Sequence, residues 1–492
     1  MADDPDTDGT RPTPPAADSQ AEAYLRVLAE GELRWVLEQP DPPPGPPGGR
    51  PSLAAAAQAV NRFRAAAGAL IAAGAIDEAT ATSILAGLVE ALTVRSKLPP
   101  VHPFRSLITP GFRPAIPKAG LPGLVRVLPV GKPVPFADGG AEHDLLHLLT
   151  LTLAPDLAVL TYAGHLPTPG HDPAPGRLPA EPFGPCGPAS VSGRLAFTDN
   201  HGTSYQASLS GGGSTDGTWW SGEFSLSPVP PGDARWIDIA PVSGPGAVRV
   251  ELTGHAADSR TPVRSPQPAA GALPASATPA ERLLDSLAQD LLWSTLWTGA
   301  GGPALSELAG MIPALTAAGA IGPGSPALGR LTALAGRLGI SLPAGLPAAP
   351  GASLPPAWDS ALAGRGRHDG RPGLAPAAAV LPDTDGARFA ITGLYSTQHA
   401  VIVRALAWGW HATRTPFPRT AGRYSWSALD DGGRWHVARQ VNAPIGGTGG
   451  HGYTDIALIP PLHPAATSLD VILTGPTARA SAAIPLTWQP LG

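Results

Sequence analysis

Ala69-Leu-Ile-Ala-Ala-Gly-Ala-Ile76 and Ala314-Leu-Thr-Ala-Ala-Gly-Ala-Ile321 are two nearly identical stretches of this 492-residue chain. Seven of their eight positions are identical, and they lie 245 residues apart. A match of this kind at a fixed separation indicates an internal repeat. We therefore expect further matches downstream, in the same order in both halves.

Weaker matches follow in that order. Val127-Leu-Pro129 recurs as Val380-Leu-Pro382, and Phe224–Pro228 aligns with Ile456–Pro460 at an offset of 232. Between them, a longer stretch aligns at an offset of 242, with identical pairs at Thr150/Thr392, Ala158/Ala400, Val159/Val401 and Ala163/Ala405. Because the offsets drift only by loop-sized amounts, the sequence predicts a tandem duplication of one unit.

Each unit is predicted to begin with three helices, because apolar residues recur there at helical spacing. Gly74 follows the second helix, where a left-handed cap conformation favours glycine. In the second copy, Leu328, Leu331 and Leu334 form one apolar stripe. The predicted helices are Glu22–Glu38, Leu53–Ala73, Glu78–Arg95, Pro279–Trp297, Ala304–Ala318 and Pro326–Leu338.

The remainder of each unit is predicted to be β structure. Apolar residues alternate between Leu145 and Leu153, as on a half-buried strand. Asp199–Gly202 and Asp430–Gly433 have the composition of tight hairpin turns. The second copy departs from the first at Asp430–His436, where we expect the hairpin to be one residue shorter. Short strands without intervening helices indicate an antiparallel β-sandwich of immunoglobulin-like type, so the fold class is α+β and multidomain.

The predicted boundaries follow from this pattern and from the Pro-rich stretches. They are a disordered acidic leader (1–20), helical subdomain 1 (21–98), β-sandwich 1 (110–256), a Pro/Ala linker (257–278), helical subdomain 2 (279–342), a Pro/Gly-rich connector (343–375) and β-sandwich 2 (376–488).

The composition excludes several classes of protein. A net charge of −5 disfavours nucleic-acid binding, which needs a basic surface to displace counterions. The most apolar helical run is interrupted by Asn61, Arg62 and Arg64, so we expect no membrane insertion. The N-terminus lacks the features of a signal peptide, and we expect a cytoplasmic location. The single cysteine, Cys186, cannot form an intrachain disulfide.

Motifs for catalysis or cofactor binding are missing. The sequence contains no nucleophile elbow, phosphate-binding loop or dinucleotide fingerprint, and no His-Glu-x-x-His. His143 and His147 have the spacing of a helical metal pair, but on a strand they would lie about 13 Å apart. Asp199, Asp430 and their neighbours fit turn chemistry better than ion binding. We therefore predict no catalytic residue, no cofactor and no metal.

The tryptophans are the candidate binding residues. Trp219 and Trp220 are adjacent, so on a strand one of them faces away from the core. Trp408 and Trp410 share one face of their predicted strand. An outward tryptophan is a plausible contact for a protein partner or a sugar ring, whereas core or edge packing is the commoner role.

The stretches Val127-Leu-Pro-Val130, Thr198–Tyr205 and Trp220–Trp236 carry a resemblance. With them the chain resembles uncharacterised actinobacterial proteins in which an N-terminal helical segment is joined to an immunoglobulin-like sandwich. These proteins have no established activity, so the resemblance implies a fold and no reaction.

Three hypotheses about function remain. We favour a non-catalytic protein-binding or scaffolding protein whose two units present surfaces to a protein partner of unknown identity. The first alternative is a carbohydrate or small-ligand binder that uses exposed tryptophans. The second is an enzyme with an unrecognised site between the units.

Overall fold

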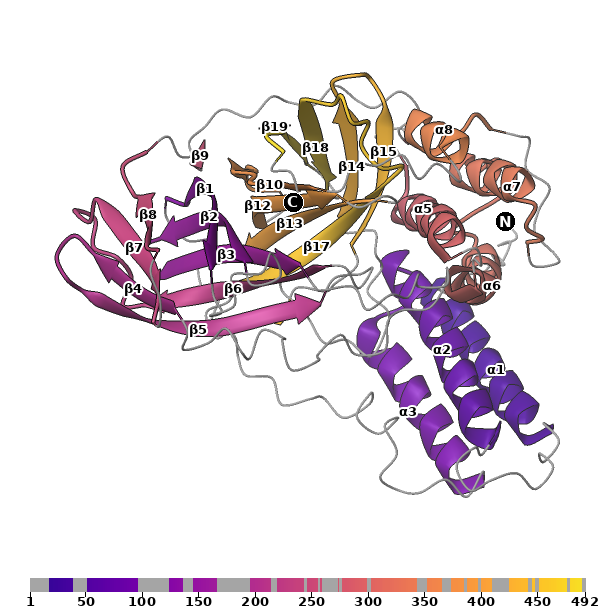
Figure 1. The fold of residues 1–492 in the computed structure, drawn as a ribbon. Coiled ribbons are helices and arrows are strands. Elements are labelled where there is room, and N and C mark those ends of the chain that lie inside the picture. Colours follow the sequence, from indigo (N-terminus) through magenta and orange to yellow (C-terminus); the bar gives the residue numbers. More distant parts are fainter. Residues whose placement is uncertain are drawn as a thin grey trace, which may run out of the picture.

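The computed structural model describes residues 17–38, 51–95, 124–135, 145–165, 195–213, 219–242, 246–254, 257–258, 273, 277–298, 302–342, 352–364, 373–384, 387–396, 400–408, 424–440, 445–446, 451–475 and 478–488. The described helices gather on one side of the molecule and two antiparallel sheets occupy the other (Figure 1). The predicted mixture of helical and sheet-rich regions is confirmed.

The first helical subdomain consists of α1 (Ala17–Glu38), α2 (Pro51–Ala72) and α3 (Glu78–Arg95). Gly74 ends α2 at a φ of 69°, and Ala75 N donates to Leu70 O at 2.9 Å. Asp77 then caps α3, because its carboxylate accepts a hydrogen bond from Thr80 N at 2.8 Å. The three predicted helices are confirmed, with ends displaced by a few residues.

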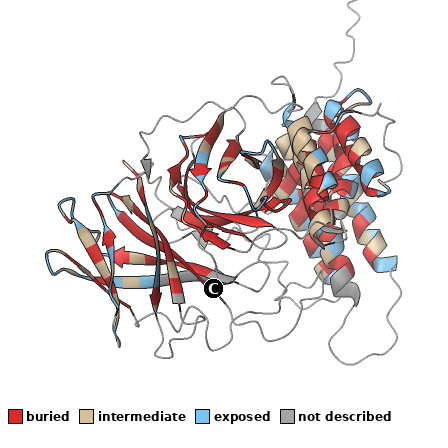
Figure 2. Ribbon diagram, turned by 45° about the horizontal axis from the view of Figure 1, so that its top comes forward, coloured by how far each residue is buried: buried red, intermediate tan, exposed pale blue. Residues whose placement is uncertain are grey.

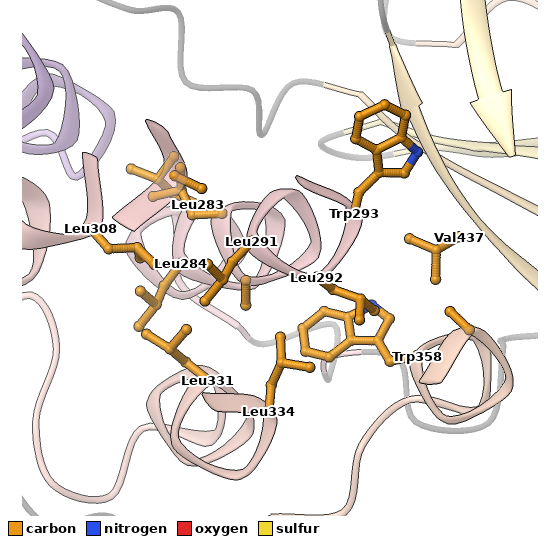
Figure 3. Close-up of a cluster of buried hydrophobic side chains, with 14 of the residues drawn as sticks. Leu283, Leu284, Leu291, Leu292, Trp293, Leu308, Leu331, Leu334, Trp358 and Val437 are labelled. Atoms are coloured by element: carbon orange, nitrogen blue, oxygen red, sulfur yellow. The ribbon is translucent and has the colours of Figure 1, made fainter. Parts of the chain in front are cut away.

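The second helical subdomain consists of α5 (Pro279–Thr298), α6 (Gly302–Ala317) and α7 (Pro326–Leu338). A short helix, α8 (Pro356–Ala363), lies in the stretch that we expected to be a connector. Figure 3 shows leucines from α5, α6 and α7 meeting Trp358 of α8, with Val437 of the second sheet beside them. These helices and the second sheet therefore share one hydrophobic core.

The first sheet has nine strands in the order β8-β7-β4-β5-β6-β3-β2-β1-β9. It curls around a core in which residues of β2, β3 and β6 meet residues of β4, β7 and β8. Its strands are β1 (Arg126–Pro135), β2 (Leu145–Ala154), β3 (Leu157–His165), β4 (Leu195–Asp199), β5 (Ser204–Gly213), β6 (Trp219–Ser227), β7 (Trp236–Pro241), β8 (Val248–Glu251) and β9 (Ala257–Asp258).

The second sheet has ten strands in the order β10-β12-β13-β17-β15-β14-β18-β19, with β11 paired to β12 and β16 paired to β17. Its strands are β10 (Gly373–Ala375), β11 (Ala379–Val380), β12 (Arg388–Ser396), β13 (Val401–Trp408), β14 (Ser425–Asp430), β15 (Trp435–Gln440), β16 (Ile445–Gly446), β17 (His451–Ile459), β18 (Ser468–Thr474) and β19 (Arg479–Pro485). Figure 2 shows this sheet almost wholly buried, whereas the first sheet carries more exposed residues.

The two sheets have corresponding strand orders. Strands β10 and β11 together take the place of β1, and the short β16 is set aside. The strands that then correspond to β2 to β8, in chain order, are β12, β13, β14, β15, β17, β18 and β19. With this correspondence, the order of strands across the two sheets is the same. Each half forms one continuous series of hydrogen-bonded strands. An immunoglobulin-like arrangement of two separate facing sheets is therefore not confirmed.

The strand registers correct the sequence alignment by one residue. Leu148 faces the core of the first sheet and pairs with Tyr162, just before a bulge at residue 149. Ile391 faces the core of the second sheet just before a bulge at residue 392. Residues at the same place relative to the bulges thus lie 243 positions apart. The pairs aligned at an offset of 242, such as Thr150/Thr392, therefore do not occupy equivalent places, since a shift of one residue moves each side chain to the opposite face of the sheet.

The Val127/Val380 match and the shorter second hairpin are also wrong. Val127 pairs with Thr152, whereas Val380 pairs with Ala390 near the opposite end of the corresponding strand, so this match is out of register. The second hairpin is not shorter than the first: Gly202 N donates to Asp199 O at 3.1 Å, and Gly433 N donates to Asp430 O at 3.0 Å.

Several predicted boundaries cross observed elements. Residues 17–20 of the expected leader belong to α1, and β9 lies at the start of the expected linker 257–278. Strand β10 and helix α8 lie in the expected connector 343–375. Cys186 and His143 are outside the described residues. No helix in the described part of the chain is long and apolar enough to cross a membrane.

Gly310 lies where α6 crosses α2, and a substitution there tests the packing of the two helices. A Cβ atom there would lie 3.0 Å from Arg62 O. We expect Gly310→Leu to lower the free energy of unfolding by about 1–3 kcal/mol or more, because the backbones would have to separate. In the control Gly87→Leu on α3, the new Cβ meets nothing within 4 Å. Equal losses in urea denaturation would contradict this packing.

Asp285 of α5 gives the helical core a pH dependence. Burial raises its pKa to about 6, although Arg330 Nη1 lies 3.2 Å from its carboxylate. The folded protein therefore keeps this proton to a higher pH than the unfolded chain does. We expect the free energy of unfolding to fall by about 1–3 kcal/mol between pH 4 and 6 from this group.

Thermal unfolding across that range measures the slope, and Asp285→Asn should remove the contribution of this group, so that stability falls less between pH 4 and 6 than in the wild type. The control is Asp359→Asn, which alters an exposed pair with Arg337 and should leave the slope in place. If Asp285→Asn keeps the wild-type slope, the buried carboxyl is not its source.

Candidate functional site: the face between the two sheets

The four candidate tryptophans do not form one exposed surface among the described residues. Trp219 and Trp220 begin β6, opposite His165 and Gly164 of β3, and their side chains lie outside the description. Trp408 ends β13 and is only 4% exposed, packed between the two sheets. Trp410 also lies outside the described residues. Trp408 is therefore not available to a partner in solution.

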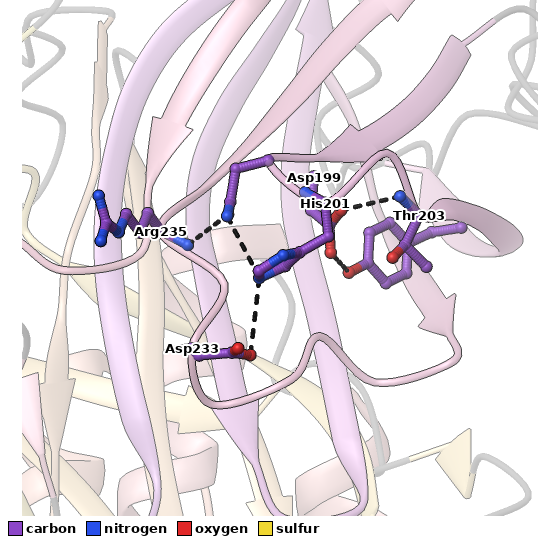
Figure 4. Close-up of polar contacts among 7 residues, drawn as sticks. Asp199, His201, Thr203, Asp233 and Arg235 are labelled. Atoms are coloured by element: carbon purple, nitrogen blue, oxygen red, sulfur yellow. Dashed lines mark hydrogen bonds and ion pairs between the residues drawn. The ribbon is translucent and has the colours of Figure 1, made fainter.

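The acidic turns are structural. Asp199 Oδ1 accepts hydrogen bonds from His201 N and Thr203 N at 2.8 Å, and Tyr205 donates to Oδ2 at 2.6 Å (Figure 4). Burial alone would raise the pKa of Asp199, but these hydrogen bonds outweigh it and lower the pKa. The carboxylate is thus used by its own turn, as the sequence predicted.

The same arrangement recurs in the second sheet. Asp430 Oδ1 accepts a hydrogen bond from Arg434 N at 2.8 Å, and His436 lies 3.6 Å from its other oxygen. Asp431 accepts one from Thr467 N at 3.0 Å, as Asn200 does from Arg235 N at 2.6 Å. In the part of the chain that the structure describes, no three His, Cys, Asp or Glu side chains gather as metal ligands.

The most unusual polar group in the described structure is a buried ion pair between β13 and β17. Arg404 Nε and Nη2 donate to the two carboxylate oxygens of Asp455 at 2.9 and 3.0 Å. Both side chains are almost inaccessible, with exposures of 0% and 1%. The guanidinium also lies 4.7 Å from the centre of the Tyr453 ring. This bidentate geometry holds the arginine rigidly.

A carboxylate of the first sheet acts on the same arginine. Burial disfavours the charged form of Arg404, but Asp455, Tyr395 and Glu223 more than compensate and raise its pKa. Glu223 belongs to β6 and is 4% exposed. The arginine of the second sheet therefore lies in the field of a carboxylate from the first.

Apolar side chains surround this polar centre and join the sheets. One cluster draws its members from β1–β3 and from β11–β13 and β17, namely Val125, Val127, Ala154, Leu157, Val159, Val380, Ala390, Leu406, Trp408 and Tyr453. Strand β13 is buried along its whole length. One face lies in its own core, and on the other face Leu406 and Trp408 lie in this contact while Ile402 lies in the helical core. The two sheets thus pack face against face.

The two sheets contact each other at their bulges. Thr150 Oγ1 of β2 donates a hydrogen bond to Thr392 O of β12 at 2.7 Å. A Cβ atom on Gly393 would lie 2.7 Å from Leu149 Cδ1, so only glycine fits there without displacing that leucine. Bulges mark places where a strand is re-aimed, and here they bring two backbones together.

We did not single out Arg404, Asp455 or Glu223 from sequence. The available signal was a charged residue within an apolar strand, as in Val401-Ile-Val-Arg-Ala-Leu-Ala-Trp408. Such a residue is expensive to bury without a partner, so it points to a buried pair. Its partner, 51 residues away, is set by sheet topology.

The arrangement holds the two sheets together. The arginine is held by a carboxylate, and apolar residues fill the surrounding contact.

No protein-family model matches the chain, and comparison with curated proteins and with solved structures finds no match.

Removing the cation tests this centre. We expect Arg404→Met to lower the free energy of unfolding by about 3–5 kcal/mol, because Asp455 is left buried without its partner. The double variant Arg404→Met/Asp455→Leu should recover most of the loss. Arg249→Met, which breaks an exposed pair with Asp238, should cost about 1 kcal/mol or less. Equal costs of the two single variants in urea would contradict this account.

Proposed function

We propose that the chain is a duplicated, non-catalytic scaffolding protein that presents the outer face of its first sheet to a protein partner. Duplication is supported by the corresponding strand orders, by the matching hairpins and by the matching ends of α2 and α6. In those helix ends, Ala75 N donates to Leu70 O and Ala320 N donates to Leu315 O, both at 2.9 Å.

The observation that carries the proposal is a contrast between the outer faces of the two sheets. In the second sheet, Val437, Ala457 and Ile459 face outward and are covered by the helical core that includes α5 and α8. Gln289 of α5 strengthens this cover by donating to Ala438 O at 2.7 Å. The outer face of the second sheet is thus apolar where α5 and α8 cover it.

Polar residues stand at the corresponding places in the first sheet. The registers of β5 and β6 put Gln206, Ser225 and Ser227 where the second sheet has Val437, Ala457 and Ile459. Gln206, Ser227 and the neighbouring Ser208 are exposed, and Ser225 is half-buried. A polar sheet face of this kind suits a reversible partner that forms hydrogen bonds.

Substitution on this face tests the proposal. Ser208→Arg places a bulky cation in the centre of the exposed face, whereas Ser83→Arg makes the same change on the exposed side of α3. We expect pull-down from the native cell extract to recover a stoichiometric protein with the wild type and with Ser83→Arg. Recovery should fall at least tenfold with Ser208→Arg. Recovery that is equal in all three, or absent from the wild type, would refute the proposal.

Sugar or small-ligand binding remains the alternative, and Trp408 is removed from its candidate residues because it is buried. Trp219 and Trp220 are the candidates that lie in a described strand. These two residues begin the strand that also carries Ser225 and Ser227. Tryptophan fluorescence titrated with a glycan panel separates the two functions. A saturable change that Trp220→Ala removes would favour ligand binding over a protein partner.

A further inference from the structure

The contacts between the two halves of the chain are reciprocal. Here the first half means α1–α3 with β1–β9, and the second half means α5–α8 with β10–β19. At the crossing of α2 and α6, Ala65 Cβ would lie 3.6 Å from a Cβ on Gly310. These residues are 245 positions apart, the offset of the matching helices. Corresponding positions of the two helices therefore meet each other.

The helical cores also exchange corresponding residues. Ala314 of α6 belongs to the hydrophobic cluster of the first helical subdomain. Ala69 of α2, its counterpart at the same offset, belongs to the cluster of the second. The pair that follows, Ala73 and Ala318, behaves in the same way. Each half thus inserts the same helix surface into the other.

The sheets repeat this relation at the bulges. With an offset of 243, Leu149 corresponds to Thr392 and Thr150 corresponds to Gly393. The hydrogen bond joins Thr150 to Thr392, and the close contact joins Gly393 to Leu149. Exchanging the two halves converts one contact into the other. This is the property of a contact that lies on a twofold axis.

We propose that the two halves pair through one isologous surface, related by a local twofold axis, and that the partner which fits this surface of the first half is a copy of the second half. The proposal rests on the duplication proposed above, but not on the outer face of the first sheet. The chain then has the architecture of a homodimer whose two subunits were joined and diverged.

The charges of Arg404, Asp455 and Glu223 favour pairing of the first half with the second half over pairing of two first halves. By the registers of the paired strands, Arg404 and Asp455 correspond to Thr161 and Glu223. Two first halves paired in this way would bury two copies of Glu223 with no arginine between them. Pairing with the second half places Arg404 there instead. Since two carboxylates buried close together repel each other, the pairing of a first half with a second half is favoured over the pairing of two first halves.

The experiment uses the full chain with a protease site inserted between residues 259 and 272, in the predicted linker. After cleavage, we expect both fragments to elute as one 1:1 complex in size-exclusion chromatography at micromolar concentration. If the fragments of the wild type separate at that concentration, the proposed pairing surface is refuted.

Matched variants test the reciprocity. Ala69→Arg and Ala314→Arg place the same side chain at corresponding positions, and each should weaken association of the cleaved fragments at least tenfold, to a similar degree. The control Ala79→Arg, on the exposed side of α3, should leave it unchanged. Weakening by only one of the two variants would overturn the twofold relation.

A milder variant covers the case in which these arginines prevent folding. Thr150→Val keeps the shape of the side chain and removes the hydrogen bond to Thr392 O. It should speed dissociation of the cleaved fragments several-fold while the far-ultraviolet circular dichroism stays that of the wild type. An unchanged dissociation rate would count against the contact. Because Ser208 lies away from this surface, failure of the partner experiment and failure of this one are distinguishable.

Discussion

The two sheets pack face against face, and this packing sets the composition of the strands and the position of the helices. The central strands of the second sheet have one face in their own core, and their other face is divided between this contact and the helical core, so both faces are largely apolar. The one ion pair that the described strands bury in it is compensated by bidentate geometry and by a nearby carboxylate. The apolar residues of this contact therefore supply its stability, and the ion pair supplies its specificity for one pairing of the sheets.

The helices extend this constraint. The second helical subdomain covers an apolar sheet face, and the first joins it through the close approach of α2 and α6. Small residues at the crossing, Ala65 and Gly310, let the two backbones approach. On the outer face of the first sheet, Gln206, Ser208 and Ser227 are exposed and Ser225 is half-buried, and these residues are polar. On these two outer faces, apolar composition goes with a helical cover and polar composition goes with exposure, as expected for a foldable sequence.

Local patterns predicted much of the fold. Helical spacing and glycine caps located six helices, and Asp-Gly turn chemistry located both hairpins, because these features depend on residues near one another in sequence. The short α8 was missed, since a Pro- and Gly-rich stretch reads as irregular. Trp408 was offered as a binding residue, although a neighbouring sheet buries it.

By itself, then, the sequence determined the kinds of element, their order and the turns between them, because hydrogen bonding and side-chain periodicity act locally. Only the tertiary structure decided the register. Ala- and Leu-rich strands align almost equally well one residue out of step, and only the bulges beside Leu148 and Ile391 show which residues correspond. It also decided the polar centre, since Arg404, Asp455 and Glu223 are brought together by strand pairing and sheet packing across long stretches of chain.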